Sequence, residues 1–139
     1  MAGMNAKERQ QEVVDDYGVI DDPLERFQII VETAASGEFP ERFRKDENLV
    51  PGCTSRVWLG AWMEDGEEVN VAIDSEAPAL KGIGGLIVRI YSGSSPDEIR
   101  ELKPSFISQL GIDRQLTPTR QRGLANIRRR LVEIVDELD

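Results

Sequence analysis

Apolar residues recur at helical spacing in a stretch that begins with a strong helix-start signal. Asp22 is a good N-cap, Pro23 fits the first helical position and Glu25 completes the capping-box spacing. Gly37 is expected to end this helix as its C′ residue. The apolar stripe of the predicted helix comprises Leu24, Phe27, Val31 and Ala34.

The C-terminal stretch carries the clearest helical pattern of the chain. Thr117 is placed to cap a long helix and Pro118 to start it. One amphipathic face runs through Leu124, Ile127, Leu131, Ile134 and Leu138. Residues 5–16 give a further helix candidate, and because this segment is polar, residues 1–19 are expected to form a loosely ordered N-terminal extension.

Two strands are predicted in the middle of the chain. Residues 57–62 are rich in β-forming residues and apolar on both faces, whereas residues 69–74 alternate between apolar and polar positions. The pair Asp65-Gly66 between them is typical of a hairpin turn. We therefore expect an antiparallel hairpin with one buried face, which on the second strand comprises Val69, Val71 and Ile73.

The pattern over residues 76–91 fits two different structures. Its apolar positions match a helical stripe, but its three glycines would each weaken a helix by about 1 kcal/mol. A buried strand through residues 86–91 is the alternative. After this stretch, the capping-box spacing of Ser95 and Glu98 predicts a short helix that ends near Lys103.

A long segment between the second helix and the first strand is rich in charged residues. It covers residues 38–52 and is predicted to be an exposed loop, of a length that is often functional. No repeat, low-complexity segment or linker divides the chain. Residues 1–139 are therefore expected to form a single α+β domain, in which helices pack against a small antiparallel sheet.

The composition excludes several kinds of catalytic site. The 139 residues include one cysteine and no histidine, so a single chain forms no internal disulfide, no Cys/His metal cage and no histidine-dependent relay. The net charge of −9 argues against nucleic acid as the main partner. The last arginines of the acid-free run over residues 120–130 are explained about as well by a solvated helix face as by a partner.

Other sequence features point to an ordinary soluble chain. No apolar run reaches the ~18 residues of a membrane helix, and the first ten residues lack the apolar core of a signal peptide. A cytoplasmic location and no membrane partner are therefore expected. The segment Gly82-Ile83-Gly84-Gly85 lacks the spacing of a phosphate-binding loop, so its glycines are expected to permit close packing.

Cys53 is the candidate nucleophile. It follows Pro51 and Gly52 in a predicted turn, and the nearby cation Arg56 would favour its thiolate form. Free cysteines are nevertheless often buried and inert, so these residues alone support a reactive and an inert thiol equally. A reactive thiol without a base or a second cysteine suits the acceptance and release of a group supplied by a partner.

Three segments resemble, in the same order, motifs of the SufE family of sulfur-acceptor proteins. They are Val50-Pro51-Gly52-Cys53-Thr54-Ser55-Arg56-Val57-Trp58, then Asp74-Ser75 leading to Leu80-Lys81-Gly82, and finally Leu116-Thr117-Pro118-Thr119-Arg120 followed by Gly123-Leu124. The likeness extends over residues 20–135. It implies a fold related to that of the IscU scaffold, with a helix rather than a strand over residues 76–91.

The resemblance also implies a sulfur relay. SufE proteins accept sulfur from a PLP-dependent cysteine desulfurase of the SufS type, as a persulfide on one cysteine, and pass it to a SufB-type iron–sulfur scaffold while stimulating the desulfurase. Carried over, Cys53 is the acceptor and persulfide carrier, and Arg56, Asp74 and Arg120 would support its loop or bind the partner. The chain would act as a carrier, as a monomer or weak homodimer, and would itself bind no cofactor and no metal.

Two other functions remain open at this point. An adaptor with an inert thiol would stimulate a desulfurase without covalent chemistry. A stand-alone sensor thiol would oxidise without any partner, although the chain has no second cysteine to resolve the product.

Overall fold

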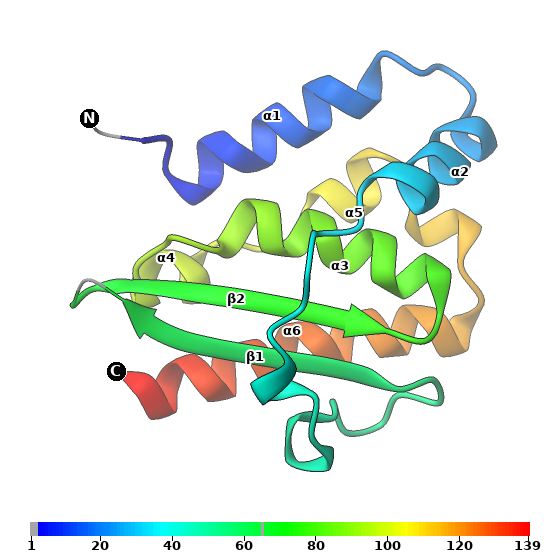
Figure 1. The fold of residues 1–139 in the computed structure, drawn as a ribbon. Helices are drawn as coiled ribbons and strands as arrows, with labels where there is room; N and C mark the ends of the chain where they lie inside the picture. The colour runs from blue at the N-terminus through cyan, green and yellow to red at the C-terminus, as the bar shows by residue number, and fades with distance from the viewer. Residues whose placement is uncertain (1–2, 65) are drawn as a thin grey trace.

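The computed structural model describes residues 3–64 and 66–139, and this part of the chain forms six α-helices and a two-stranded antiparallel sheet (Figure 1). The predicted α+β class is confirmed. In chain order the elements are α1 (Ala6–Gly18), α2 (Pro23–Thr33), η1 (Glu41–Phe43), η2 (Asp46–Asn48), β1 (Val57–Glu64), β2 (Glu68–Ser75), α3 (Pro78–Tyr91), α4 (Pro96–Glu101), α5 (Phe106–Gln109), η3 (Asp113–Gln115) and α6 (Pro118–Leu138).

β1 and β2 form the predicted hairpin. Their register pairs Leu59 with Ile73, and both side chains are buried in the main core, against which α3 and α6 pack. Of the predicted turn, Asp65 lies outside the described residues. Gly66 has a φ of 81°, in the left-handed region that favours glycine.

The opposite face of the hairpin is covered as well, which corrects the prediction of a hairpin with one buried face. The loop predicted to be exposed over residues 38–52 is exposed only in part, because Phe39 and Val50 are buried. Figure 1 shows this segment, in cyan, passing from α2 across α3 and the sheet. Within this segment, Phe39 forms a second small core with Trp58 of β1 and Ala72 of β2. Arg44 lies over the rings of Phe39 and Trp58 at 5.0 and 4.9 Å. Residues 57–62 are apolar on both faces because both faces are buried.

The stretch over residues 76–91 forms the helix α3, so the strand alternative is wrong. Gly82 and Gly85 lie where the helix meets α2 and the residues that follow it, and Gly84 lies against Ile73 of β2. A Cβ atom at Gly85 would come within 1.8 Å of the Ala34 carbonyl oxygen, and one at Gly82 within 2.9 Å of the Ile30 carbonyl oxygen. The two helices approach so closely that only glycine fits, as predicted for these residues.

The predicted apolar stripe of α2 is partly wrong. Leu24 is 52% exposed, whereas Ile30, which was not in the stripe, is fully buried. The helix also ends earlier than expected, because its C-cap is Ala34 rather than a residue next to Gly37. The buried face of α2 is therefore the one that meets α3.

α1 is attached to the rest of the fold by specific contacts. Val13 is fully buried, and Arg89 of α3 forms ion pairs with Glu12 and Asp16 at 2.8 and 2.6 Å. The side chain of Gln10 is also buried. The polar sequence of this segment had suggested only a loosely ordered extension. Along the parts of the chain that the structure describes, no helix is both long and apolar enough to cross a membrane.

Candidate functional site

Cys53 lies in a short loop that closes just before β1. The Val50 amide donates a hydrogen bond to the Val57 carbonyl at 2.9 Å, so residues 50–57 form a hairpin-like tip, here called the cysteine loop. Gly52 has a φ of 82°, a conformation that other residues rarely adopt. The motif therefore encodes a tight turn that presents the side chain of Cys53.

The second half of the cysteine loop is fixed at the junction of β2 and α3. The Arg56 carbonyl accepts hydrogen bonds from the Ser75 hydroxyl at 2.8 Å and from the Glu76 amide at 3.1 Å. The Ser75 hydroxyl oxygen in turn accepts one from the Ala77 amide at 3.1 Å. Both ends of the loop are thus held, and the residues around Cys53 span the gap between them.

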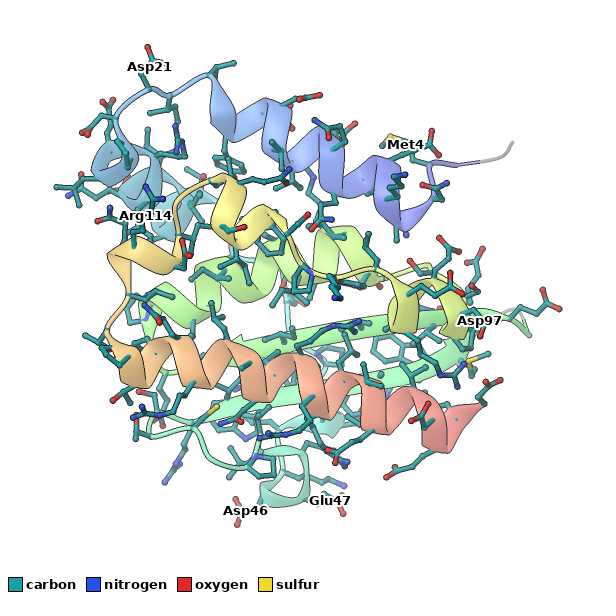
Figure 2. The ribbon with its side chains drawn as sticks, turned by 180° about the vertical axis from the view of Figure 1, so that it is seen from behind. Met4, Asp21, Asp46, Glu47, Asp97 and Arg114 are labelled. Atoms are coloured by element: carbon teal, nitrogen blue, oxygen red, sulfur yellow. The ribbon has the colours of Figure 1, made fainter. Side chains whose placement is uncertain are left out.

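α6 forms the wall against which the thiol rests. Cys53 is half-buried, and its Sγ atom donates to the Gly123 carbonyl at 3.7 Å. A Cβ atom at Gly123 would lie 3.8 Å from that sulfur and 3.8 Å from a methyl group of Leu80. One turn along α6, the side chain of Asn126 lies directly against Gly52, where an added Cβ atom would come within 2.7 Å of it. Figure 2 shows α6 crossing the molecule from the end near Arg114 to the end near Asp97.

Burial raises the pKa of the Cys53 thiol above its ordinary value, because desolvation disfavours the charged thiolate. The expectation that Arg56 favours the thiolate is not met by this arrangement. The guanidinium of Arg56 is two-thirds exposed and lies 3.7 Å from a carboxylate oxygen of Glu76. The resting thiol is therefore protonated at neutral pH.

Asp74 lies on β2, opposite Trp58 in the sheet register. Its carboxylate receives Arg44 at 2.8 Å and Lys81 at 3.4 Å. Burial opposes ionisation, but the hydrogen bonds from Arg44 and the Ser75 amide and the charge of Lys81 outweigh it and lower the pKa of Asp74. Asp74 thus holds Arg44 on the outer face of the sheet, next to the segment that leads into the cysteine loop.

Arg120 lies in the first turn of α6, where its amide donates to the capping hydroxyl of Thr117 at 3.2 Å. Gly123 follows it at the i+3 position, so both lie on one side of the helix. The Nη1 atom of Arg120 is buried and has no hydrogen-bond partner within residues 3–64 and 66–139. The partner-binding or loop-supporting roles of Arg56, Asp74 and Arg120 stay predictions.

The described residues contain no group of three or more side chains suited to hold a metal ion. The chemistry that the described site offers is that of one thiol in a short loop, sheltered by the neighbouring helix. Such a thiol can form a covalent bond to an incoming sulfur once it leaves its shelter and loses its proton.

Comparison with known proteins identifies the family. The family model described as the Fe-S metabolism associated domain, SufE, matches residues 11–135. The chain belongs to the SufE family. A hypothetical protein from Thermus thermophilus, whose solution structure is known, is similar to the chain with a TM-score of 0.76 at 26% identity, over 94% of this chain and 95% of that one.

Sequence relatives of the chain carry SufE names. The chain is 30% identical over 118 residues to SufE-like protein 1, chloroplastic/mitochondrial, of Arabidopsis thaliana, which covers 84% of this chain and 32% of that protein. It is 34% identical over 91 residues to the cysteine desulfuration protein SufE of Wigglesworthia glossinidia brevipalpis, or 64% of this chain and 62% of that protein. The chain thus spans about a third of the length of the Arabidopsis relative.

Within this SufE fold, sequence reasoning missed two residues that contact the cysteine loop. Gly123 was noted only as part of a motif, and Asn126 was not singled out. A signal for the first existed, because a glycine within an otherwise strong helical pattern lowers helix stability and usually has a packing or functional reason. Nothing in the sequence distinguishes Asn126 from a solvated polar residue on the same helix.

Proposed function

We propose that the chain accepts sulfur from a cysteine desulfurase as a persulfide on Cys53 and passes it to an iron–sulfur scaffold, stimulating the desulfurase as it does so. The observation that carries this proposal is the solitary thiol at the tip of the cysteine loop, set against Gly123 in a chain of the SufE family. The name of the Wigglesworthia relative, a cysteine desulfuration protein, supports it.

The transfer balances without an external oxidant or reductant. The Cys53 thiol first gives up its proton, and the thiolate then attacks the outer sulfur of the persulfide on the desulfurase. A bond forms between Sγ of Cys53 and that sulfur, while the sulfur–sulfur bond of the donor breaks and its cysteine leaves as a thiolate. The second transfer repeats this exchange, with an acceptor thiolate on a SufB-type scaffold as nucleophile and Cys53 as leaving group.

The proposed transfer requires two states of the thiol, of which the structure describes the sheltered one. Against α6 it is half-buried and its raised pKa keeps it protonated, which slows oxidation by solvent-borne reagents. In this proposal, contact with the desulfurase moves the cysteine loop away from α6. The thiol then becomes solvated and ionises next to the donor persulfide. PLP belongs to the desulfurase, and transfer through Cys53 calls for no cofactor on this chain.

The test is sulfur loading of Cys53. The protein is incubated with a SufS-type desulfurase and cysteine, and its intact mass is measured before and after reduction with dithiothreitol. We expect one added sulfur that reduction removes, none in Cys53→Ser, and loss of desulfurase stimulation in that variant. Ser55→Ala, two residues along the same loop, serves as the control that keeps both activities.

A different outcome would favour the adaptor. If Cys53→Ser stimulates the desulfurase fully and supports sulfur delivery, the thiol is inert and the proposal is wrong. If Cys53 instead oxidises readily to a sulfenic acid without any desulfurase, the thiol is a sensor rather than a carrier.

A further inference from the structure

Positive charge is concentrated on α6 in an otherwise acidic chain. From Arg114 to Val132 the sequence has six arginines and no acidic residue, although the net charge of the whole chain is −9. Some of these arginines are engaged within the fold. Arg128 donates to two backbone carbonyls, those of residues 100 and 102, at 3.1 Å each, and Arg130 pairs with Glu133 and Glu137 at 3.7 and 3.6 Å.

Arg122 and Arg129 are exposed and remain free of carboxylates. In the described part of the chain neither forms an ion pair. Each donates only to an uncharged side chain of α6, namely Thr119 at 3.4 Å for Arg122 and Asn126 for Arg129. Among the residues that the structure describes, two exposed positive charges therefore stand on this helix without an internal carboxylate partner.

The two arginines lie on the side of α6 that holds the cysteine loop. Residues 122, 126 and 129 are spaced as i, i+4 and i+7, so they form one row along about 10 Å of the helix. The middle member, Asn126, lies against Gly52 of the loop. Gly123, which accepts the thiol, directly follows Arg122. The name arginine row is used here for Arg122, Asn126 and Arg129.

We propose that the arginine row is the docking surface for an acidic patch on the protein that donates sulfur to Cys53. The inference rests on the proposed function and adds the chemistry by which the donor is recognised. An acidic donor patch is repelled by most of a chain with a charge of −9 and attracted where exposed arginines lie close together without carboxylate partners. Because the row adjoins the cysteine loop, this charge pattern orients the donor with its persulfide toward Cys53.

Arg56 adds a third exposed positive charge, on the cysteine loop itself. The Arg56 guanidinium is 66% exposed and faces Glu76 only at 3.7 Å, with that carboxylate itself half exposed. An exposed pair of this kind exchanges partners at little cost. Arg56 can therefore turn from Glu76 to a donor carboxylate near the cysteine loop.

Binding is tested separately from sulfur transfer. In the Cys53→Ser background, affinity for a SufS-type desulfurase is measured by calorimetry at low and at physiological salt. We expect Arg122→Glu/Arg129→Glu to weaken binding at least about tenfold and to reduce its salt dependence. Lys7→Glu, which makes the charge change of either single substitution but on α1 at the far side of the fold in Figure 1, should stay within about twofold. Equal affinity of the double variant and the parent would overturn the inference.

A second measurement needs no desulfurase. The rate of Cys53 with the dianionic disulfide 5,5′-dithiobis(2-nitrobenzoate) is divided by its rate with the neutral 4,4′-dithiodipyridine. The positive charge of the arginine row should favour the dianionic reagent and so raise this ratio at low salt. Arg122→Glu/Arg129→Glu should lower the ratio about tenfold, whereas Arg122→Lys/Arg129→Lys, which keeps the charge, should leave it near the parent value. Division by the neutral rate removes any general change in thiol exposure. An unchanged ratio means that the arginines do not reach the thiol, and it overturns the inference.

The outcomes separate this inference from the proposed function. Loss of sulfur loading in the parent protein, with charge-dependent binding retained, would reject the carrier function alone. Normal loading and binding in the double variant would reject the docking surface alone. Sedimentation could instead show that the parent protein is a dimer and that the double variant is a monomer. The arginine row would then be a self-association surface, and its assignment to a donor would be wrong.

Discussion

At the scale of single residues, the state of the Cys53 thiol is decided by a helix 70 residues away in the sequence. The sequence places Cys53 in a turn and puts Arg56 three residues later, which predicts an activated thiolate. In the structure burial against α6 raises the pKa, and Arg56 lies toward Glu76. Local spacing revealed the turn, but it does not fix where a flexible arginine points or what covers the thiol.

The raised pKa of Cys53 has a measurable consequence for reactivity. We expect the rate of alkylation by iodoacetamide to rise with pH around a midpoint above the ordinary thiol value of 9.0. The chain unfolded in urea gives the matched control, because its thiol is solvated and titrates at the ordinary pKa. A folded midpoint equal to or below that of the unfolded chain would contradict the buried, neutral resting thiol.

The same shift links Cys53 to stability. A folded-state pKa above the unfolded value means that the folded protein holds the proton more strongly. The resulting stabilisation is complete below the unfolded pKa and is lost as the pH rises through the folded pKa. Urea unfolding at alkaline pH should therefore show a loss of stability that Cys53→Ala lacks.

At the scale of elements, the sequence predicted caps and strands better than it predicted which faces are buried. The cap at Thr117 and the hairpin were correct because their signals are local. The pattern over residues 76–91 alone does not decide between helix and strand. The loss of helix stability caused by its glycines can be read from the sequence, whereas the close packing against α2 that they permit is seen only in the structure. The sequence predicts an exposed loop over residues 38–52 because Phe39 and Phe43 stand among charged residues and follow no regular spacing, so the small core that they help to form is not visible from the pattern.

Two glycines in helix interiors test this account as a matched pair. Replacement by alanine gives each helix the same intrinsic gain of about 1 kcal/mol. At Gly85 the new methyl group meets the Ala34 carbonyl at 1.8 Å, and overpacking of this kind costs at least about 1–3 kcal/mol. At Gly123 the nearest atoms are 3.8 Å away, an ordinary contact. Urea unfolding should show Gly85→Ala less stable and Gly123→Ala as stable or more stable than the parent.

Two results would contradict the expected difference in stability between Gly85→Ala and Gly123→Ala or change its meaning. If both variants are destabilised to the same extent, the close approach of α2 and α3 does not explain the glycine. If Gly123→Ala instead exposes the thiol, its alkylation by iodoacetamide will accelerate at constant stability, which places the effect at the cysteine loop.

At the scale of the whole molecule, the single α+β layout followed from the order of patterns, but the attachment of α1 did not. The reason is chemical. Gln10 is buried, and its side chain accepts from the Phe106 amide at 3.1 Å and donates to the Lys103 carbonyl at 3.2 Å. A glutamine counts as polar in any hydrophobicity pattern, so a helix held by such bonds looks like a solvated one. Only the partner groups, more than 90 residues away, reveal that it is buried.

Deletion of residues 1–19 therefore should destabilise the protein rather than leave it unchanged. Removal of the buried Val13 side chain costs about 1.5–3 kcal/mol, and loss of Gln10 leaves the Phe106 amide without its partner at a further cost of about 1–3 kcal/mol. Deletion of residues 1–4 is the control, because it stops before the N-cap of α1 at Asn5. Equal urea midpoints for the two deletions would instead support the prediction that residues 1–19 form a loosely ordered extension. If the longer deletion does not fold, Gln10→Ala decides the question, because only a docked helix makes that substitution costly.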